Sequence, residues 1–207
     1  MLRMPTLETA RLVIRPLTMA DLEAIYQILD VDLADADTGS EGTKALDDRR
    51  RWLEWTVLSY EELARLYQPP YGERAVVLRE SGQLIGACGY APYLNAFGQL
   101  PSFRAGQSIR PGLASPEFGL YWAIAPAHQR RGYATEAARA LLDHAFTALR
   151  LARVVATTSY DNAASTGVMH KLGMRIETNP YPEPPWLQVA GVLENDRVQP
   201  SEMSKQN

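Results

Sequence analysis

An α/β fold built on one mixed sheet is the class that this sequence predicts, from three observations. Short runs rich in branched apolar residues alternate with longer segments whose apolar residues recur at helical spacing. The runs 75–78 and 84–90 are joined by the turn-like segment 80–83, which predicts an antiparallel hairpin. A strand, a helix and a strand over 118–158 require a right-handed crossover, which makes those two strands parallel.

The elements ahead of the hairpin are predicted to be one strand and two helices. Residues 11–15 are rich in branched side chains and suit a strand. Residues 22–29 recur at helical spacing after acids in the first turn, and a second helix is predicted over 47–66, where two prolines end it. The acid-rich stretch 30–42 is predicted to be a loop, whose Asp residues either attract a cationic substrate or form an ordinary solvated surface.

The second half of the chain alternates strands and helices. Gly173 suits the C-cap of the shorter helix, and a proline-rich turn at 179–185 separates the last two strands. The predicted elements are a strand at 118–124, a helix at 134–149, a strand at 153–158, a helix at 162–172, and strands at 174–177 and 186–193.

One long stretch, 93–115, has three glycines, two prolines and no sustained period. A loop of that length is either functional or a plain surface insertion. No repeat or linker divides the chain, so residues 1–195 are predicted to form a single domain and 196–207 a polar tail.

Composition excludes several classes of protein. The 207 residues are 46% hydrophobic with a net charge of −3, which gives no nucleic-acid-binding signal. No apolar run spans a membrane, and the chain opens on a polar strand-like segment instead of a signal peptide, so a cytoplasmic protein is expected. Cys88 alone forms no disulfide within the chain and is expected to be a core thiol. The three histidines lack metal-ligand spacing, so no metal is predicted.

A candidate anion site lies in Gln129-Arg130-Arg131-Gly132-Tyr133-Ala134, between a predicted strand and a predicted helix. Backbone N–H groups at a helix N-terminus bind anions, glycine permits backbone geometry closed to other residues, and the small alanine lets a ligand approach. The hexapeptide predicts a phosphate or pyrophosphate site, although a basic loop before a helix is often only a solvated cap.

The same hexapeptide resembles the acetyl-CoA loop of the GNAT N-acetyltransferases. Four further segments, in family order, resemble the branch of ribosomal-protein N-terminal acetyltransferases: 8–17, 117–124, 132–137, and 162–165 followed by 171–174. The resemblance implies the GNAT fold, a mixed and mostly antiparallel sheet splayed between two parallel strands and flanked by helices. It also implies acetyl-CoA as acetyl donor, with no metal.

By this resemblance, the cofactor would be held at two places. Its pyrophosphate would sit on the loop, where Gln129 and residues Arg130 to Thr135 would bind it. Its pantetheine arm would pair with the backbone of Trp122, Ala123 and Ile124, with Asn162 holding it from the other side. The Ile124 N–H would polarise the thioester carbonyl.

The attacking amine must lose a proton, and related enzymes use a glutamate through a bridging water, a role that falls here on Glu117. An exposed strand-end carboxylate is the alternative for this residue. Neutralising a lysine-like amine at pH 7 costs roughly 4 to 5 kcal/mol, whereas an α-amine near pKa 8 costs about 1 kcal/mol.

The leaving thiolate must gain a proton, and many family members use a tyrosine of the last helix for this step. No tyrosine lies between Asn162 and Gly173. Ser165 is therefore the candidate acid, although it also suits a hydrogen-bonding position at a helix start, and Tyr160 is the fallback.

The sequence predicts an acetyl-CoA-dependent N-acetyltransferase that moves an acetyl group to a primary amine by direct attack in a ternary complex. The acceptor would be a small-molecule amine or a protein N-terminal α-amine. The alternative is a non-catalytic acyl-CoA sensor or scaffold of the same fold, and transfer of a longer acyl group stays open. The protein would be a monomer or a homodimer, with no nucleic-acid or membrane partner.

Overall fold

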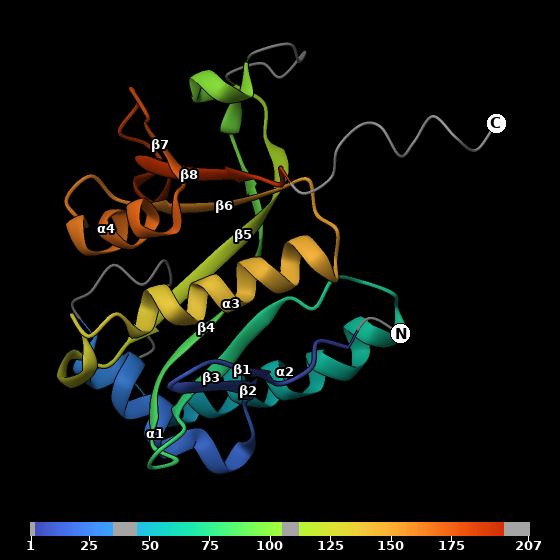
Figure 1. Ribbon diagram of the computed structural model, residues 1–207, viewed down its shortest axis with the longest axis vertical. Coiled ribbons are helices and arrows are strands. Elements are labelled where there is room, and N and C mark those ends of the chain that lie inside the picture. The colour runs from blue at the N-terminus through green and yellow to red at the C-terminus, as the bar shows by residue number, and fades with distance from the viewer. Residues whose placement is uncertain (1–2, 35–44, 105–111, 197–207) are drawn as a thin grey trace.

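The computed structural model describes residues 3–34, 45–104 and 112–196, which build one eight-stranded sheet with helices on both faces (Figure 1). The strand order is β1-β2-β3-β4-β5-β6-β8-β7. Neighbouring strands pair antiparallel except β5 and β6, which are parallel, as the crossover rule predicts. The strands are β1 (Leu7–Glu8), β2 (Leu12–Pro16), β3 (Gly72–Leu78), β4 (Leu84–Asn95), β5 (Ser115–Ile124), β6 (Arg153–Thr158), β7 (Arg175–Thr178) and β8 (Val189–Glu194).

The helices lie in two pairs. The first pair is α1 (Leu22–Tyr26) and α2 (Leu46–Arg65), and the second is α3 (Tyr133–Thr147) and α4 (Ala163–Leu172). Gly173 caps α4 with a left-handed φ of +81°, as its sequence position predicts. None of the helices over the described ranges is both long and apolar enough to cross a bilayer.

Each face of the sheet carries its own core, because successive strand residues point to opposite faces. On one face, Leu12 and Ile14 of β2 pack with Leu141 of α3. On the other, Ala75 and Val77 of β3 pack with the apolar stripe of α1 and α2. A third cluster, against the antiparallel pair β6 and β8, contains Phe97, Phe103 and Leu187. The face on which a strand residue lies can therefore be assigned from its position in the strand.

Several predicted boundaries are wrong. Residues 93–95 are the end of β4, and two 3₁₀ turns, Phe97–Gln99 and Pro101–Phe103, follow where an irregular stretch was expected. Residues 105–111 of that stretch lie outside the described residues. The last strand begins at Val189, and the residues before it form the 3₁₀ turn Pro185–Leu187. Propensity could not locate these boundaries because the partner strands determine how far each ladder extends.

The prediction of a loop from residue 30 is also wrong at its start. A π-helical segment, Gln27–Asp32, continues α1. Asp30 is buried and accepts from Nε and Nη2 of Arg49 at 2.6 and 2.9 Å, so it is not a solvated loop acid. Residues 35–42 of the predicted loop lie outside the described residues. So do residues 197–207 of the predicted tail.

Candidate active site

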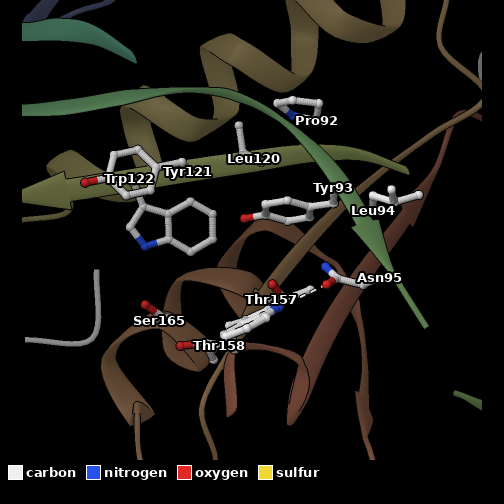
Figure 2. Close-up of a pocket in the computed structure, with 11 residues that line it drawn as sticks. Pro92, Tyr93, Leu94, Asn95, Leu120, Tyr121, Trp122, Thr157, Thr158 and Ser165 are labelled. Atoms are coloured by element: carbon white, nitrogen blue, oxygen red, sulfur yellow. Dashed lines mark hydrogen bonds between the residues drawn. The ribbon is translucent and has the colours of Figure 1, made fainter. Parts of the chain in front are cut away.

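A cavity of about 430 Å³ opens where the parallel strands β5 and β6 separate (Figure 2). The two strands pair at Gly119 and Val155. Beyond that point the cavity occupies the space between them. Its lining residues come from β4, β5, β6, α4 and the turn before β8: Pro92, Tyr93, Leu94, Asn95, Leu120, Tyr121, Trp122, Thr157, Thr158, Ser165 and Trp186.

The cavity reaches both faces of the sheet. Leu120 and Trp122 of β5 pack in the core beneath α3 and α4, whereas Tyr121 between them packs against the core of α1 and α2. All three residues line the cavity. Alternate residues of a strand point to opposite faces, so the opening passes through the sheet. A molecule held on the α3–α4 side can therefore meet a second molecule entering from the α1–α2 side.

The backbone of β5 offers polar groups to this opening. The Ala125 N–H donates to the Ile85 carbonyl at 2.8 Å, toward β4. Backbone groups of alternate residues in an antiparallel ladder point to opposite sides, so those of Trp122 and Ile124 point toward β6. The resemblance implies that Trp122, Ala123 and Ile124 pair with the pantetheine arm, but the backbone groups of Ala123 point toward β4, as those of Ala125 do.

The loop before α3 has the geometry of an anion site. Gly132 is the N-cap of α3 with φ +83°, in the left-handed region that favours glycine, and no side chain caps the helix. Arg130 also has a left-handed φ of +60°. The first N–H groups of this 15-residue helix lack a side-chain acceptor, and the positive end of the helix dipole is at the same place. The geometry fits the phosphates of a coenzyme.

Arg11 ties this loop to the sheet, which the sequence did not reveal. Its Nη1 donates to the Arg131 carbonyl at 3.0 Å, and its Nε donates to Glu136 Oε2 at 2.7 Å. The guanidinium also lies over the Tyr133 ring, 4.5 Å from its centroid. The Thr9 hydroxyl donates to Glu136 Oε1 at 2.6 Å. The hydrogen bonds from Thr9 and Arg11 outweigh the effect of burial and lower the pKa of Glu136. This carboxylate therefore stays ionised and keeps its contacts to the loop.

Two predicted cofactor residues have local partners. Gln129 Nε2 donates to the Ile124 carbonyl at 2.9 Å and so joins the loop to the end of β5. Asn162 Oδ1 accepts from the Ser165 N–H at 3.0 Å and caps α4. Both amides therefore stabilise local backbone, and neither is among the described residues that line the cavity.

Glu117 has a partner that the sequence did not indicate. Its carboxylate is buried, and both of its oxygens accept from Arg153 of β6, Oε2 from Nε at 2.7 Å and Oε1 from Nη2. Arg153 also lies over the Phe103 ring at 4.7 Å. Glu117 is not among the described residues that line the cavity. The geometry favours an ion pair between the parallel strands over a carboxylate facing the cavity.

Of the two candidate acids, only Ser165 lines the cavity. Figure 2 shows its hydroxyl on the cavity side of α4, beside Thr158. The Tyr160 hydroxyl instead donates to the Asn179 carbonyl at 2.5 Å, in the segment that joins β7 to β8. Tyr160 therefore stabilises that segment.

The opposite end of the cavity is aromatic. In Figure 2 the Tyr93 hydroxyl points into the cavity. Trp186 Nε1 donates to Asn95 Oδ1 at 3.0 Å, which holds the indole against the end of β4. Tyr121 is partly buried, and burial raises the pKa of its hydroxyl. The strand alternation of 120–122 was the sequence signal that could have placed Tyr121 opposite the cofactor residues.

Glu73 is a further acid that the sequence reading passed over. It pairs in register with Gly89, which pairs in turn with Tyr121, so Glu73 and Tyr121 share the α1–α2 face. Burial raises the pKa of Glu73. No ion pair of Glu73 occurs within the described residues.

The remaining reactive side chains have structural environments. Cys88 is fully buried on β4, where burial raises the pKa of its thiol to about 12, so it is the core thiol that the sequence predicts. Within the part of the chain that the structure covers, no cluster of three His, Cys, Asp or Glu side chains could hold a metal ion.

A mixed sheet that opens between two parallel strands is the arrangement expected of the acetyltransferase class that the sequence resembles. Residues 11–175 match the acetyltransferase (GNAT) domain family. The chain belongs to that family and is an N-acetyltransferase. Acetyl-CoA is the acetyl donor of the family.

Individual relatives agree with this assignment. The chain is 28% identical over 174 residues, 84% of each chain, to the uncharacterized N-acetyltransferase YoaA of Bacillus subtilis (strain 168). The crystal structure of an acetyltransferase from Agrobacterium tumefaciens str. C58 is similar with a TM-score of 0.64 and 26% identity, over 92% of this chain and 95% of that one. RimJ of Mycobacterium smegmatis, in complex with CoA-disulfide, is similar in fold, with a TM-score of 0.61 and 17% identity over 90% and 83% of the chains.

Proposed function

We propose that the protein transfers an acetyl group from acetyl-CoA to a primary amine of low basicity, by direct attack within a ternary complex. The observation that carries this proposal is the cavity that passes through the sheet between β5 and β6. It allows donor and acceptor to approach from opposite faces and meet without a covalent acetyl-enzyme.

The donor end uses the loop before α3 and the backbone of β5. The N–H groups of the first turn of α3, with Gly132 leaving room beside them, bind the pyrophosphate. Residues Arg130 to Thr135 form this cradle, and Arg11 holds it in place. The backbone of Trp122 and Ile124 pairs with the pantetheine arm, and Asn162 contributes its Nδ2 from across the opening. Acetyl-CoA supplies a thioester, whose carbonyl carbon is open to attack by an amine.

Two proton movements accompany the exchange of bonds. The amine nitrogen forms a bond to the carbonyl carbon, the carbon–sulfur bond breaks, the nitrogen loses a proton, and the sulfur gains one. Ser165 lines the cavity on the coenzyme side and donates a hydrogen bond to the departing sulfur. The Ile124 N–H stabilises the charge that develops on the carbonyl oxygen. Glu117 keeps β5 and β6 at the spacing that both contacts need.

The end of the cavity that would hold the acceptor favours an amine that is already partly neutral at pH 7. Among the described residues that line the cavity there is no carboxylate, so none of them is an anionic base facing the amine. A lysine-like amine costs roughly 4 to 5 kcal/mol to deprotonate at pH 7 and an α-amine about 1 kcal/mol. The aromatic rings of Tyr93, Tyr121 and Trp186 attract an ammonium group before it loses its proton. The acceptor class that fits is an α-amine of a peptide N-terminus or a small molecule.

The test combines calorimetry and turnover in one preparation. Titration with acetyl-CoA measures binding, and thiol release is followed with paired acceptors, a dipeptide amide with a free α-amine and its Nα-blocked lysine counterpart. The expected result is binding with turnover on the α-amine and at least tenfold less on the lysine amine. Turnover only on the lysine amine would contradict the acceptor class. Binding without turnover on any amine would favour the sensor alternative, and no binding would contradict the donor assignment.

A further inference from the structure

A second cavity, of about 470 Å³, lies where α2 packs against the end of β2 and the start of β3. Its walls are largely apolar and include Leu17, Val57, Leu58 and Pro70. None of the residues that line it belongs to the cavity between β5 and β6. One charged side chain of the sheet, Arg74 of β3, also lines it.

Arg74 is a buried cation without an acid. The residue is 3% exposed, and its Nε and Nη1 atoms are buried with no hydrogen-bond partner among the described residues. Other buried or half-buried arginines of the described chain show the usual solution, since Arg49 pairs with Asp30 and Arg15 with Asp21. An unpaired charge in a protein interior is costly, because burial removes its hydration. Burial accordingly lowers the pKa of Arg74.

The surroundings hold Arg74 in place without neutralising it. The Tyr60 ring lies beside the guanidinium, 5.1 Å from its carbon to the ring centroid. The Tyr60 hydroxyl is already used, because it donates to the Glu73 carbonyl and accepts from the Leu17 N–H. Among the described residues of the cavity wall the one carboxylate is Glu61, which pairs with Arg3 at 3.4 Å, and both side chains are mostly exposed. The described residues therefore offer the Arg74 guanidinium no anion.

We propose that this cavity binds a small organic carboxylate with an apolar body, whose anionic group pairs with Arg74. The guanidinium presents a planar set of donors that suits a carboxylate, and a pair formed out of water is stronger than one at the surface. The apolar walls favour a ligand that buries hydrocarbon as well as charge. A cavity of this volume accommodates a ligand of the size of benzoate or hexanoate.

The experiment measures binding of benzoate and hexanoate to the full chain by calorimetry and by shift of Tm, with benzamide and hexanamide as neutral counterparts. The acids are expected to bind and raise Tm, and the amides to bind at least tenfold more weakly. Arg74→Met is expected to abolish the preference for the acids and, without ligand, to raise Tm because the unpaired charge is gone. Equal binding of acids and amides would overturn the proposal, and so would binding of inorganic phosphate alone.

A second variant keeps the test decisive if Arg74→Met does not fold. Leu58 lines the cavity and is 61% exposed, so Leu58→Glu places a competing carboxylate at its wall with little cost to the fold. Trp55→Glu, on the same helix and 60% exposed, adds the same charge away from the cavity. Benzoate binding is expected to fall at least tenfold in Leu58→Glu and to stay within twofold in Trp55→Glu. Equal binding by the two variants would overturn the assignment.

Discussion

Arg153 of β6 holds both carboxylate oxygens of Glu117 of β5, next to the parallel pairing of Gly119 and Val155. This ion pair joins the two strands whose separation forms the cavity. It is largely buried, with the side chains 25% and 5% exposed. Breaking a buried pair costs about 3 kcal/mol, because one charge stays behind without its partner.

Because Glu117 and Arg153 form one ion pair, we expect replacement of either residue to have the same effect on stability and turnover. Glu117→Gln and Arg153→Gln are each expected to lower the free energy of unfolding by about 3 kcal/mol and to reduce turnover by similar factors, with the pH profile unchanged. Denaturant unfolding and pH–rate profiles check this. A loss of roughly 10²- to 10⁴-fold in Glu117→Gln alone, with removal of the acidic limb of the profile, would instead make Glu117 the base.

Gly132 is expected to be essential for cofactor affinity. A side chain here would occupy the space beside the first turn of α3, so Gly132→Leu should weaken acetyl-CoA binding at least ~10²-fold. Gly82→Leu is the matched control, because Gly82 also has a left-handed φ of +71° but lies in the β3–β4 turn. Titration calorimetry measures the acetyl-CoA affinity of both variants. Unchanged affinity in Gly132→Leu would disprove the loop assignment.

Ser165 is expected to affect the chemical step and leave binding intact. Ser165→Ala keeps the backbone N–H that Asn162 accepts, so α4 remains capped. We expect kcat to fall roughly 10²-fold with the KM for acetyl-CoA unchanged. Tyr160→Phe, whose hydroxyl is bound to the Asn179 carbonyl, should keep kcat within twofold. The reverse order in steady-state kinetics would transfer the role of acid to Tyr160.

Trp186 is expected to determine acceptor binding. Trp186→Ala removes an aromatic wall and should raise the KM for the amine about tenfold, with the acetyl-CoA affinity unchanged. Asn95→Ala loses only the hydrogen bond of about 1 kcal/mol that fixes the indole, so a smaller rise of about fivefold is expected. Bisubstrate kinetics measure both effects. An equal rise in both Michaelis constants would contradict a role specific to the acceptor.

Glu73 gives a prediction for stability against pH. Because its pKa is raised in the folded state above the ordinary 4.5, folding favours the protonated carboxyl. The loss of stability that an ionised Glu73 causes in the folded protein is therefore absent below the pKa of the unfolded state. It appears as the pH rises through that value. Glu73→Gln should be more stable than the parent at pH 7 and equal to it below about pH 4. Denaturant midpoints at both pH values measure this, and a variant that is less stable at pH 7 would contradict it.

Much of the fold follows from local patterns. The hairpin of β3 and β4, the crossover from β5 through α3 to β6 and the Gly173 cap all lie where the sequence predicts them. Each depends on short-range features: turn composition, helical spacing or a left-handed glycine. The end of β4 at Asn95 could not be predicted in this way, because its pairing with β5 is a long-range contact.

The residues of the candidate site also fall into two groups, those that a local sequence pattern indicates and those that only the tertiary structure brings together. The motif residues at 129–135, Asn162 and Ser165 could be selected from the sequence because they lie in contiguous segments of recognisable composition. The partner of Glu117 could not, because Arg153 lies 36 residues away in a strand with no charge pattern that indicates it. Trp186 could not be assigned to the cavity wall for the same reason, since only the assembled sheet brings β4 and the turn before β8 together.

The sequence by itself determined the α/β class, the order of the elements, the candidate anion-binding loop and the family to which the chain belongs, because periodicity and contiguous motifs are local properties of the chain. Only the tertiary structure decided that Glu117 is held by Arg153, that the cavity passes through the sheet, and that Arg74 is buried with no acid beside it among the described residues. Burial and pairing of charges depend on which distant segments meet, and the free energy of each charge depends on that environment.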